Sequence, residues 1–288
     1  MPVVPPVGLA AASPTLRQLL LGWSLAPVPL LGVAALVCAY GVGIRRLRDM
    51  GRHWPRARTV AFMAGCGVVT VALESGLAAY DDRYFSFHVG EHLLLSMVGP
   101  PLLALGAPVT LALQAGSRRT QRRLLRVLHS RPMTILTHPL VAWVLFAGSM
   151  FALYFSNLYA LSLRNPAVHD LVHVHFLVVG VLFFWPVVGL DPTAWRLNHG
   201  LRLLYVFVAL PFHAFLGIAL LSGNEPLFAA HTLSDQHAGA GILWAVGDLL
   251  SLATVAVVLT QWKAHEDRES IREDRRLDAA RLEHRPVG

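Results

Sequence analysis

Two pairs of histidines have the spacing of a metal-binding helix face. His88 and His92 are four residues apart, and so are His169 and His173. If both segments are helical, each pair lies on one face, with its imidazoles about 6 Å apart along the axis. Two neutral imidazoles at this spacing can bind one metal ion, and two such helices facing each other can supply three or four nitrogen ligands. The pairs therefore predict a site for a metal that accepts imidazole, such as copper, zinc, iron or nickel.

A fifth histidine and two methionines extend the predicted ligand set. His213 lies in another apolar segment, so a helix there would bring a further imidazole. Met97 and Met150 also lie in apolar segments, and thioether sulfur would favour Cu(I). Nearby polar groups would balance charge or orient the imidazoles, as carboxylates do around metal-bound histidines. The predicted supporting residues are Glu74, Glu91, His175, Asp235, His237 and Asp248.

The elements that carry these residues have the composition of membrane helices. Hydrophobic residues make up 55% of the 288-residue chain and charged residues 14%, whereas a soluble domain has about 25% charged residues. A membrane span needs about 20 mostly apolar residues. We therefore predict an all-α, polytopic transmembrane bundle of seven spans, with the third bent at its prolines. The predicted spans are 24–44, 59–80, 86–113, 137–160, 168–189, 201–222 and 239–262.

The positions of lysine and arginine predict how this bundle is oriented. Of the 24 basic residues, 21 fall in the segments 45–58, 114–136, 190–202 and 263–288, and only three fall on the other side. Because basic loops stay in the cytoplasm, the N-terminus is expected outside and the C-terminus inside. The predicted parts are an extracytoplasmic segment 1–23, a membrane domain 24–262 and a charged cytoplasmic tail 263–288.

This orientation places the paired histidines and His213 in the outer half of the spans, while the inner half has almost no ionisable groups. One histidine at a membrane interface often only hydrogen-bonds to water or lipid headgroups, but packing alone would not sort so many polar groups to one side. Ionisable groups inside spans are costly and indicate function. The net charge of +7 does not indicate nucleic acid as a partner, because the arginines flank the spans in short loops, where they face lipid headgroups.

Six stretches, taken together and in this order, resemble the bacterial caa3-type cytochrome c oxidase assembly factor family, CtaG. They are 88–108 (HVGEHLLLSMVGPPLLALGAP), 137–139 (THP), 173–176 (HVHF), 183–192 (FFWPVVGLDP), 211–217 (PFHAFLG) and 239–248 (GAGILWAVGD). The chain departs from the family pattern at His237, where glutamine is usual, and at Asp248, where glutamate is common. The second change keeps the carboxylate.

The resemblance implies a multi-pass protein of the bacterial plasma membrane that helps to mature a haem–copper oxidase without being an enzyme. Copper would be its cargo, oxidase subunits its partners, and an extracytoplasmic copper donor a further partner. Two alternatives stay open on the residues alone. A transporter of copper or protons would use the same histidines and carboxylates, and a membrane b-type cytochrome would use histidines as axial haem ligands. Haem is the less favoured cofactor, because no helix carries two histidines separated by the depth of a membrane.

Overall fold

The structure is a computed structural model that describes residue 17, residues 22–24 and residues 26–283. Most of the predicted segment 1–23 lies outside the described residues, as does the end of the predicted tail, 284–288. Every regular element within the described ranges is a helix. In chain order these are α2 (Pro27–Asp49), α3 (Arg56–Glu74), α4 (Gly76–Tyr80), α5 (Phe85–Leu93), the π-helix η1 (Leu94–Val98), α6 (Gly99–Leu105), α7 (Pro108–Ala115), α8 (Arg118–Leu128), α9 (Arg131–Leu136), α10 (Pro139–Tyr154), α11 (Leu158–Arg164), α12 (Pro166–Val188), α13 (His199–Leu221) and α14 (Leu233–Glu283).

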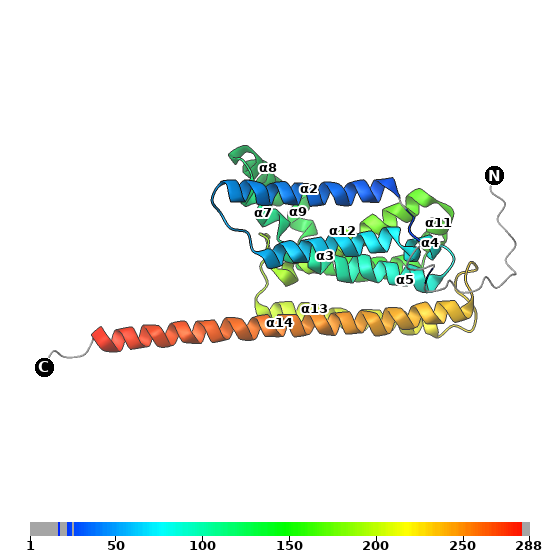
Figure 1. Cartoon of the computed structure of the whole chain (residues 1–288). Helices are drawn as coiled ribbons and strands as arrows, with labels where there is room; N and C mark the ends of the chain where they lie inside the picture. Colours follow the sequence, from blue (N-terminus) through cyan, green and yellow to red (C-terminus); the bar gives the residue numbers. More distant parts are fainter. Residues whose placement is uncertain (1–16, 18–21, 25, 284–288) are drawn as a thin grey trace.

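The long helices run side by side as a bundle with two distinct ends (Figure 1). The short helices α4 and α11 lie at one end, called here the α4/α11 end, and α8 lies at the other. Six helices among the described residues are long and apolar enough to cross a membrane, and a bent pair raises the number to seven. The predicted multi-span helical architecture is therefore confirmed. The prediction that the α4/α11 end faces outward remains a prediction.

The fourth predicted span, 137–160, is a broken helix. α10 has 16 residues, fewer than the roughly 20 that a membrane core requires, and α11 follows it at an angle of 70°. The break is stabilised by Ser156, whose hydroxyl donates to Ala152 O at 2.5 Å and accepts from Leu158 N at 3.1 Å. Serine side chains compete with helical backbone bonds in this way. The sharp turn leaves α11 at the same end of the bundle as α4.

The third predicted span, 86–113, bends where prolines remove backbone donors, as the sequence predicted. It consists of α5, η1, α6 and α7 in succession. The π-helical turn η1 comes just before Pro100 and Pro101, which lack the N–H groups that a regular helix would use. A second break follows at Ala107, whose φ of 48° is left-handed. The Asp191 carboxylate then accepts from Val109 N at 3.2 Å and Thr110 N at 2.7 Å, at the start of α7.

α12 packs closely against this irregular segment, and a glycine makes the contact possible. A Cβ atom on Gly180 would lie 2.6 Å from both Pro100 Cγ and Ser96 O. The backbone oxygen cannot rotate away as a side chain would. Because α12 carries one histidine pair and α5 the other, this contact helps to determine how far apart the two pairs lie.

The substitution Gly180→Ala should therefore destabilise the protein. Alanine is a better helix former than glycine by about 1 kcal/mol, but forcing a methyl group into this contact should cost about 1–3 kcal/mol. Gly148→Ala in α10 is the matched control, since a Cβ there meets nothing within 4 Å. We expect a lower unfolding midpoint for Gly180→Ala and an unchanged or higher one for Gly148→Ala, measured by titrating a denaturing detergent. Equal midpoints for the two variants would contradict the packing argument.

Two features distinguish the end of the bundle opposite α4 and α11. α8 carries five exposed arginines, Arg118, Arg119, Arg122, Arg123 and Arg126, and no described acidic side chain forms an ion pair with them. α14 is one continuous helix of 51 residues that extends well past the other helices on this side (Figure 1). It contains both the last predicted span and most of the predicted tail.

Candidate metal centre

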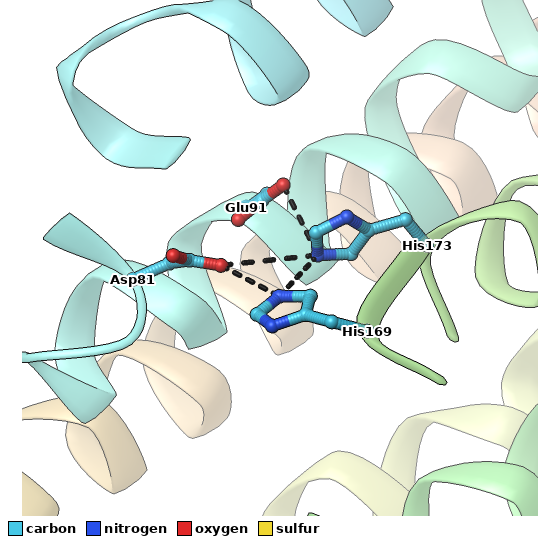
Figure 2. Close-up of side chains that lie close together, drawn as sticks. All are labelled: Asp81, Glu91, His169 and His173. Carbon is cyan, nitrogen blue, oxygen red and sulfur yellow. Dashed lines mark hydrogen bonds and ion pairs between the residues drawn. The ribbon is translucent and has the colours of Figure 1, made fainter. Parts of the chain in front are cut away.

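Four side chains converge near the α4/α11 end of the bundle (Figure 2). They are Asp81, Glu91, His169 and His173, and each offers one ligand atom within 4.8 Å of the others. They come from three segments: Asp81 directly follows α4, Glu91 is on α5, and the two histidines are on α12. Residues far apart in the sequence thus form one polar cluster, called here the metal centre.

The nitrogen and oxygen atoms of the metal centre face a common point. His169 Nε2 lies 2.7 Å from Asp81 Oδ2 and 3.0 Å from His173 Nε2. His173 Nε2 lies 3.2 Å from Glu91 Oε1 and 3.9 Å from Asp81 Oδ2. A neutral N–H···N hydrogen bond accounts for the distance between the two imidazole nitrogens. The two carboxylates beside them add negative charge, and this charge favours a positively charged species at the centre.

The burial of the carboxylates leads to the same conclusion. Glu91 is 0% exposed and Asp81 is 5% exposed. Neither oxygen of Glu91 accepts a hydrogen bond from any described residue. Its Oε1 lies 3.2 Å from His173 Nε2, and a buried carboxylate is costly unless a proton, a positive partner or a metal compensates its charge. Among these, a metal ion would satisfy both acids and both histidines at once.

The donors of the metal centre suit a divalent transition metal. Two imidazole nitrogens and two carboxylate oxygens form a mixed ligand set, which Zn²⁺, Fe²⁺ and Cu²⁺ accept. Cu(I) favours sulfur ligands. Met97 and Met150, which the sequence suggested as sulfur donors, are both buried members of the main hydrophobic core. The side chains present therefore fit a metal ion in its divalent state.

The α5 helix is held in place by a residue that lies far away in the sequence. Asp235, in the first turn of α14, accepts hydrogen bonds from Phe85 N at 2.6 Å and Ser86 N at 3.3 Å. It also accepts one from the Ser86 hydroxyl at 2.6 Å. The carboxylate thus satisfies free N–H groups at the start of α5, where negative charge is favoured. Asp235 thus contacts the helix that carries Glu91, and the supporting role predicted for it stays a prediction.

Two hydrogen bonds of His231 hold the segment that contains Asp81 in place. His231, in the segment before α14, accepts a hydrogen bond from the Tyr159 hydroxyl at Nε2, 2.7 Å away. Its Nδ1 lies 3.2 Å from Arg83 O, to which it donates. A neutral imidazole with its proton on Nδ1 satisfies both contacts. Burial lowers the pKa of His231 and so favours this neutral form.

The first histidine pair lies directly beside the metal centre. His88 and His92 are 0% and 1% exposed, and their ring centroids are 3.9 Å apart. The ring of His88 is 5.8 Å from that of His169, and the ring of His92 is 5.9 Å from that of His173. The structure thus brings the two predicted pairs face to face, although the four ligand atoms grouped above include only one pair.

The other predicted residues lie outside the metal centre. His213 is buried against Gly247 of α14 and near Phe146 of α10. Asp248 follows Gly247 on α14, and its Oδ1 has no hydrogen-bond partner in the described part of the chain. Glu74 instead supports the start of α2, because its Oε2 accepts from Ala26 N at 2.6 Å.

The remaining two histidines also point elsewhere. His175 is exposed on α12. His237 Nε2 lies 3.3 Å from Gly223 O, which joins the start of α14 to the segment after α13. Neither residue belongs to the group of four ligand atoms, and the supporting roles predicted for them stay predictions.

Asp81 was missed by the sequence-based prediction. It lies between two predicted spans in the pair Asp81-Asp82, seven residues before His88. Acidic residues in a short connection beside a histidine pair can indicate further metal ligands. A short connection keeps their carboxylates close to the start of the helix that carries the histidines. The prediction took Asp235 and His237 from the connection before the last span but did not consider the connection that carries Asp81.

Comparisons with known proteins agree with the resemblance noted from the motifs. Residues 38–265 match a family described as cytochrome c oxidase caa3 assembly factor. Uncharacterized proteins of Mycobacterium bovis and Mycobacterium tuberculosis are each 37% identical over 286 residues, covering 92% of this chain and 43% of the relative. One from Mycobacterium leprae is 35% identical over 270 residues, covering 87% and 41%. The chain spans less than half the length of these relatives. No solved structure matches significantly.

Acidification should weaken the link between His231 and the Asp81 segment. The folded protein lowers the pKa of His231 below its ordinary value of 6.5. At a pH well above 6.5, the His231 imidazole is therefore neutral in both the folded and the unfolded protein. As the pH falls below that value, the unfolded chain binds a proton that the folded protein excludes, so stability falls by up to about 1.4 kcal/mol per pH unit. Asp235, 3.9 Å from Nδ1, only partly offsets this.

We expect the thermal midpoint of the unsubstituted protein to fall more steeply between pH 7 and pH 5 than that of His231→Gln. The comparison between the two curves removes the contribution of the other histidines. Parallel curves would show that His231 does not titrate with unfolding.

Proposed function

We propose that this chain, which belongs to the cytochrome c oxidase caa3 assembly factor family, binds a transition-metal ion at Asp81, Glu91, His169 and His173 and passes it, as copper, to an oxidase during assembly. The observation that carries this proposal is the convergence of four ligand atoms, two of them from buried carboxylates, within 4.8 Å of one another. The role is that of a metal-binding assembly factor and not of an enzyme.

The location of the metal centre supports delivery on one side of the membrane. It lies near the α4/α11 end, whereas the five arginines of α8 lie at the opposite end. If the basic end is cytoplasmic, the metal centre lies in the outer half of the membrane. A copper donor and an oxidase subunit would then both be met from outside the cell.

The composition of the ligand set supports copper in its divalent state as the bound species. Carboxylate and imidazole ligands favour Cu²⁺ over Cu⁺, for which sulfur would be expected. The ligands also come from three separate segments, so the ion links α5, α12 and the connection that carries Asp81. Movement of that one connection would remove a ligand without unfolding either helix, which suits an ion that must be released again.

Replacing Asp81 should weaken metal binding without disturbing the fold. Asp81→Asn keeps the size of the side chain but removes its charge, and loss of a group that supports a metal typically costs 10–100-fold in affinity, so at least that is expected for a ligand. Asp82→Asn is the matched control, because Asp82 is the adjacent residue and its side chain is 61% exposed. Competition between the purified protein and a coloured chelator for Cu²⁺ measures the affinities. The proposal fails if Asp81→Asn binds as tightly as Asp82→Asn.

The proposed delivery role is tested in cells. Deleting the gene should lower the copper content of the haem–copper oxidase while its haem content is maintained, and Asp81→Asn should restore less oxidase copper than Asp82→Asn does. Metal analysis and haem spectra of the purified oxidase provide the measurement. An oxidase with a full copper content in the deletion strain would reject delivery, even if the isolated protein binds metal.

A further inference from the structure

The arginine-rich helix α8 has no part in the proposed metal centre, because it lies at the opposite end of the bundle (Figure 1). It belongs to the connection between two membrane-crossing elements. The third of these elements ends at Ala115, and the broken fourth begins at Pro139. Since α8 and α9 make up most of this connection, both lie where the bundle meets a membrane surface.

The basic and apolar residues of α8 lie on different faces of the helix. With 3.6 residues per turn, its five arginines fall within an arc of about 140°. The apolar residues fall on the other side of the helix, and they are Leu124, Leu125, Val127 and Leu128. This separation is typical of helices that lie in the membrane interface, with the apolar face against lipid chains and the basic residues at the headgroups.

A sharp turn keeps α8 from continuing the axis of α7. The backbone is extended at Gly116 and Ser117, with ψ of 149° and 160°. The side-chain amide of Gln121 then donates to Leu113 O at 2.9 Å and to Gly116 O at 3.2 Å. In one continuous helix, residues 113 and 121 would be about 12 Å apart along the axis. These two bonds therefore hold α8 folded back beside the end of α7.

The apolar face of α8 is only partly covered by protein. Leu128 lines a small cavity together with Trp185 of α12, so part of this face is directed toward the bundle. Other apolar side chains of α8 and α9 are 40–59% exposed, and they are Leu125, Val127, Ile135 and Leu136. Apolar side chains that stay open at a membrane surface suit contact with lipid chains.

The arginine face needs negative charge from outside the helix. Arg118, Arg122 and Arg126 follow one another at intervals of four residues, a spacing at which like charges repel. Arg118 and Arg119 also lie in the first turn of α8, where the helix dipole favours negative charge. No described acidic side chain forms an ion pair with any arginine of α8. Guanidinium groups bind phosphate oxygens strongly, so phosphate groups would supply the missing charge.

We propose that α8 lies in the plane of the membrane surface and binds the phosphate groups of anionic lipids through its arginines. Nucleic acid or an acidic protein would also supply negative charge, but only a lipid supplies phosphate and apolar chains together. The exposed leucine and valine of α8 beside the arginines therefore favour lipid. This inference does not depend on a metal ion at the metal centre.

Lipid binding by the full chain tests this proposal. The protein is purified in mild detergent and titrated with phosphatidylglycerol or with phosphatidylcholine, and bound lipid is counted by native mass spectrometry. We expect the unsubstituted chain to bind more phosphatidylglycerol than phosphatidylcholine. Arg118→Gln/Arg122→Gln/Arg126→Gln should bind fewer phosphatidylglycerol molecules and as much phosphatidylcholine, because each arginine near an anionic lipid strengthens binding about fivefold. Glutamine keeps the helix propensity of arginine.

A second triple variant separates the α8 surface from the total charge of the chain. Arg268→Gln/Arg272→Gln/Arg275→Gln removes the same charge from exposed positions on the part of α14 that extends past the other helices. This control should bind phosphatidylglycerol as the unsubstituted chain does. The proposal is overturned if both triple variants lose the same number of lipids, or if the α8 variant loses none.

Two further measurements test the lipid and the in-plane placement directly. Inorganic phosphate at the same concentration as the lipid should not displace phosphatidylglycerol from the unsubstituted chain. Complete displacement would make the arginines a site for soluble phosphate and overturn the proposal. Leu125→Ser/Val127→Ser keeps every arginine but should bind less phosphatidylglycerol, because lipid chains lose their apolar contacts. Unchanged binding in this variant would overturn the placement of α8 in the membrane surface.

Discussion

The arrangement of this protein depends on one electrostatic constraint, which is the burial of carboxylates and imidazoles at one end of an apolar bundle. Asp81, Glu91 and the paired histidines have little contact with water, and Glu91 has no hydrogen-bond donor among the described residues. Groups of this kind are tolerated in a low-dielectric environment only when charge and hydrogen bonding are compensated. Much of the surrounding structure can be understood as holding the compensating partners in place.

Three contacts restrain the helices that carry the polar groups. Gly180 allows α12 to approach the π-helical segment that continues α5. Asp235 satisfies the start of α5 from α14. His231 joins the segment next to Asp81 to Tyr159 on α11. The break in the fourth span is part of the same arrangement. Tyr154 lies just before the turn between α10 and α11 and Tyr159 just after it, and the rings of both tyrosines lie near the ring of His88.

The sequence was sufficient to predict some features and insufficient for others, for physical reasons. Hydropathy predicts spans because a membrane core imposes a length, and an i, i+4 spacing predicts that His88 and His92 share a face. Neither property depends on distant residues. The ligand role of Asp81 depends on how a short connection folds back over two helices, and the separation of His213 from the pairs depends on which face of α13 meets α14. The break at Ser156 likewise follows from local hydrogen bonds that compete with an otherwise apolar run.

The long helix α14 has a mechanical consequence for whatever meets the far end of the bundle. A helix of 51 residues is about 75 Å long, more than twice the roughly 30 Å of a hydrocarbon core. The part of α14 that extends beyond the other helices is therefore a rigid continuation of a membrane span. A molecule that binds the C-terminal turns of α14 is held at a fixed distance from the lipid surface. A force on that molecule is transmitted along the helix axis to Asp235 and the start of α5.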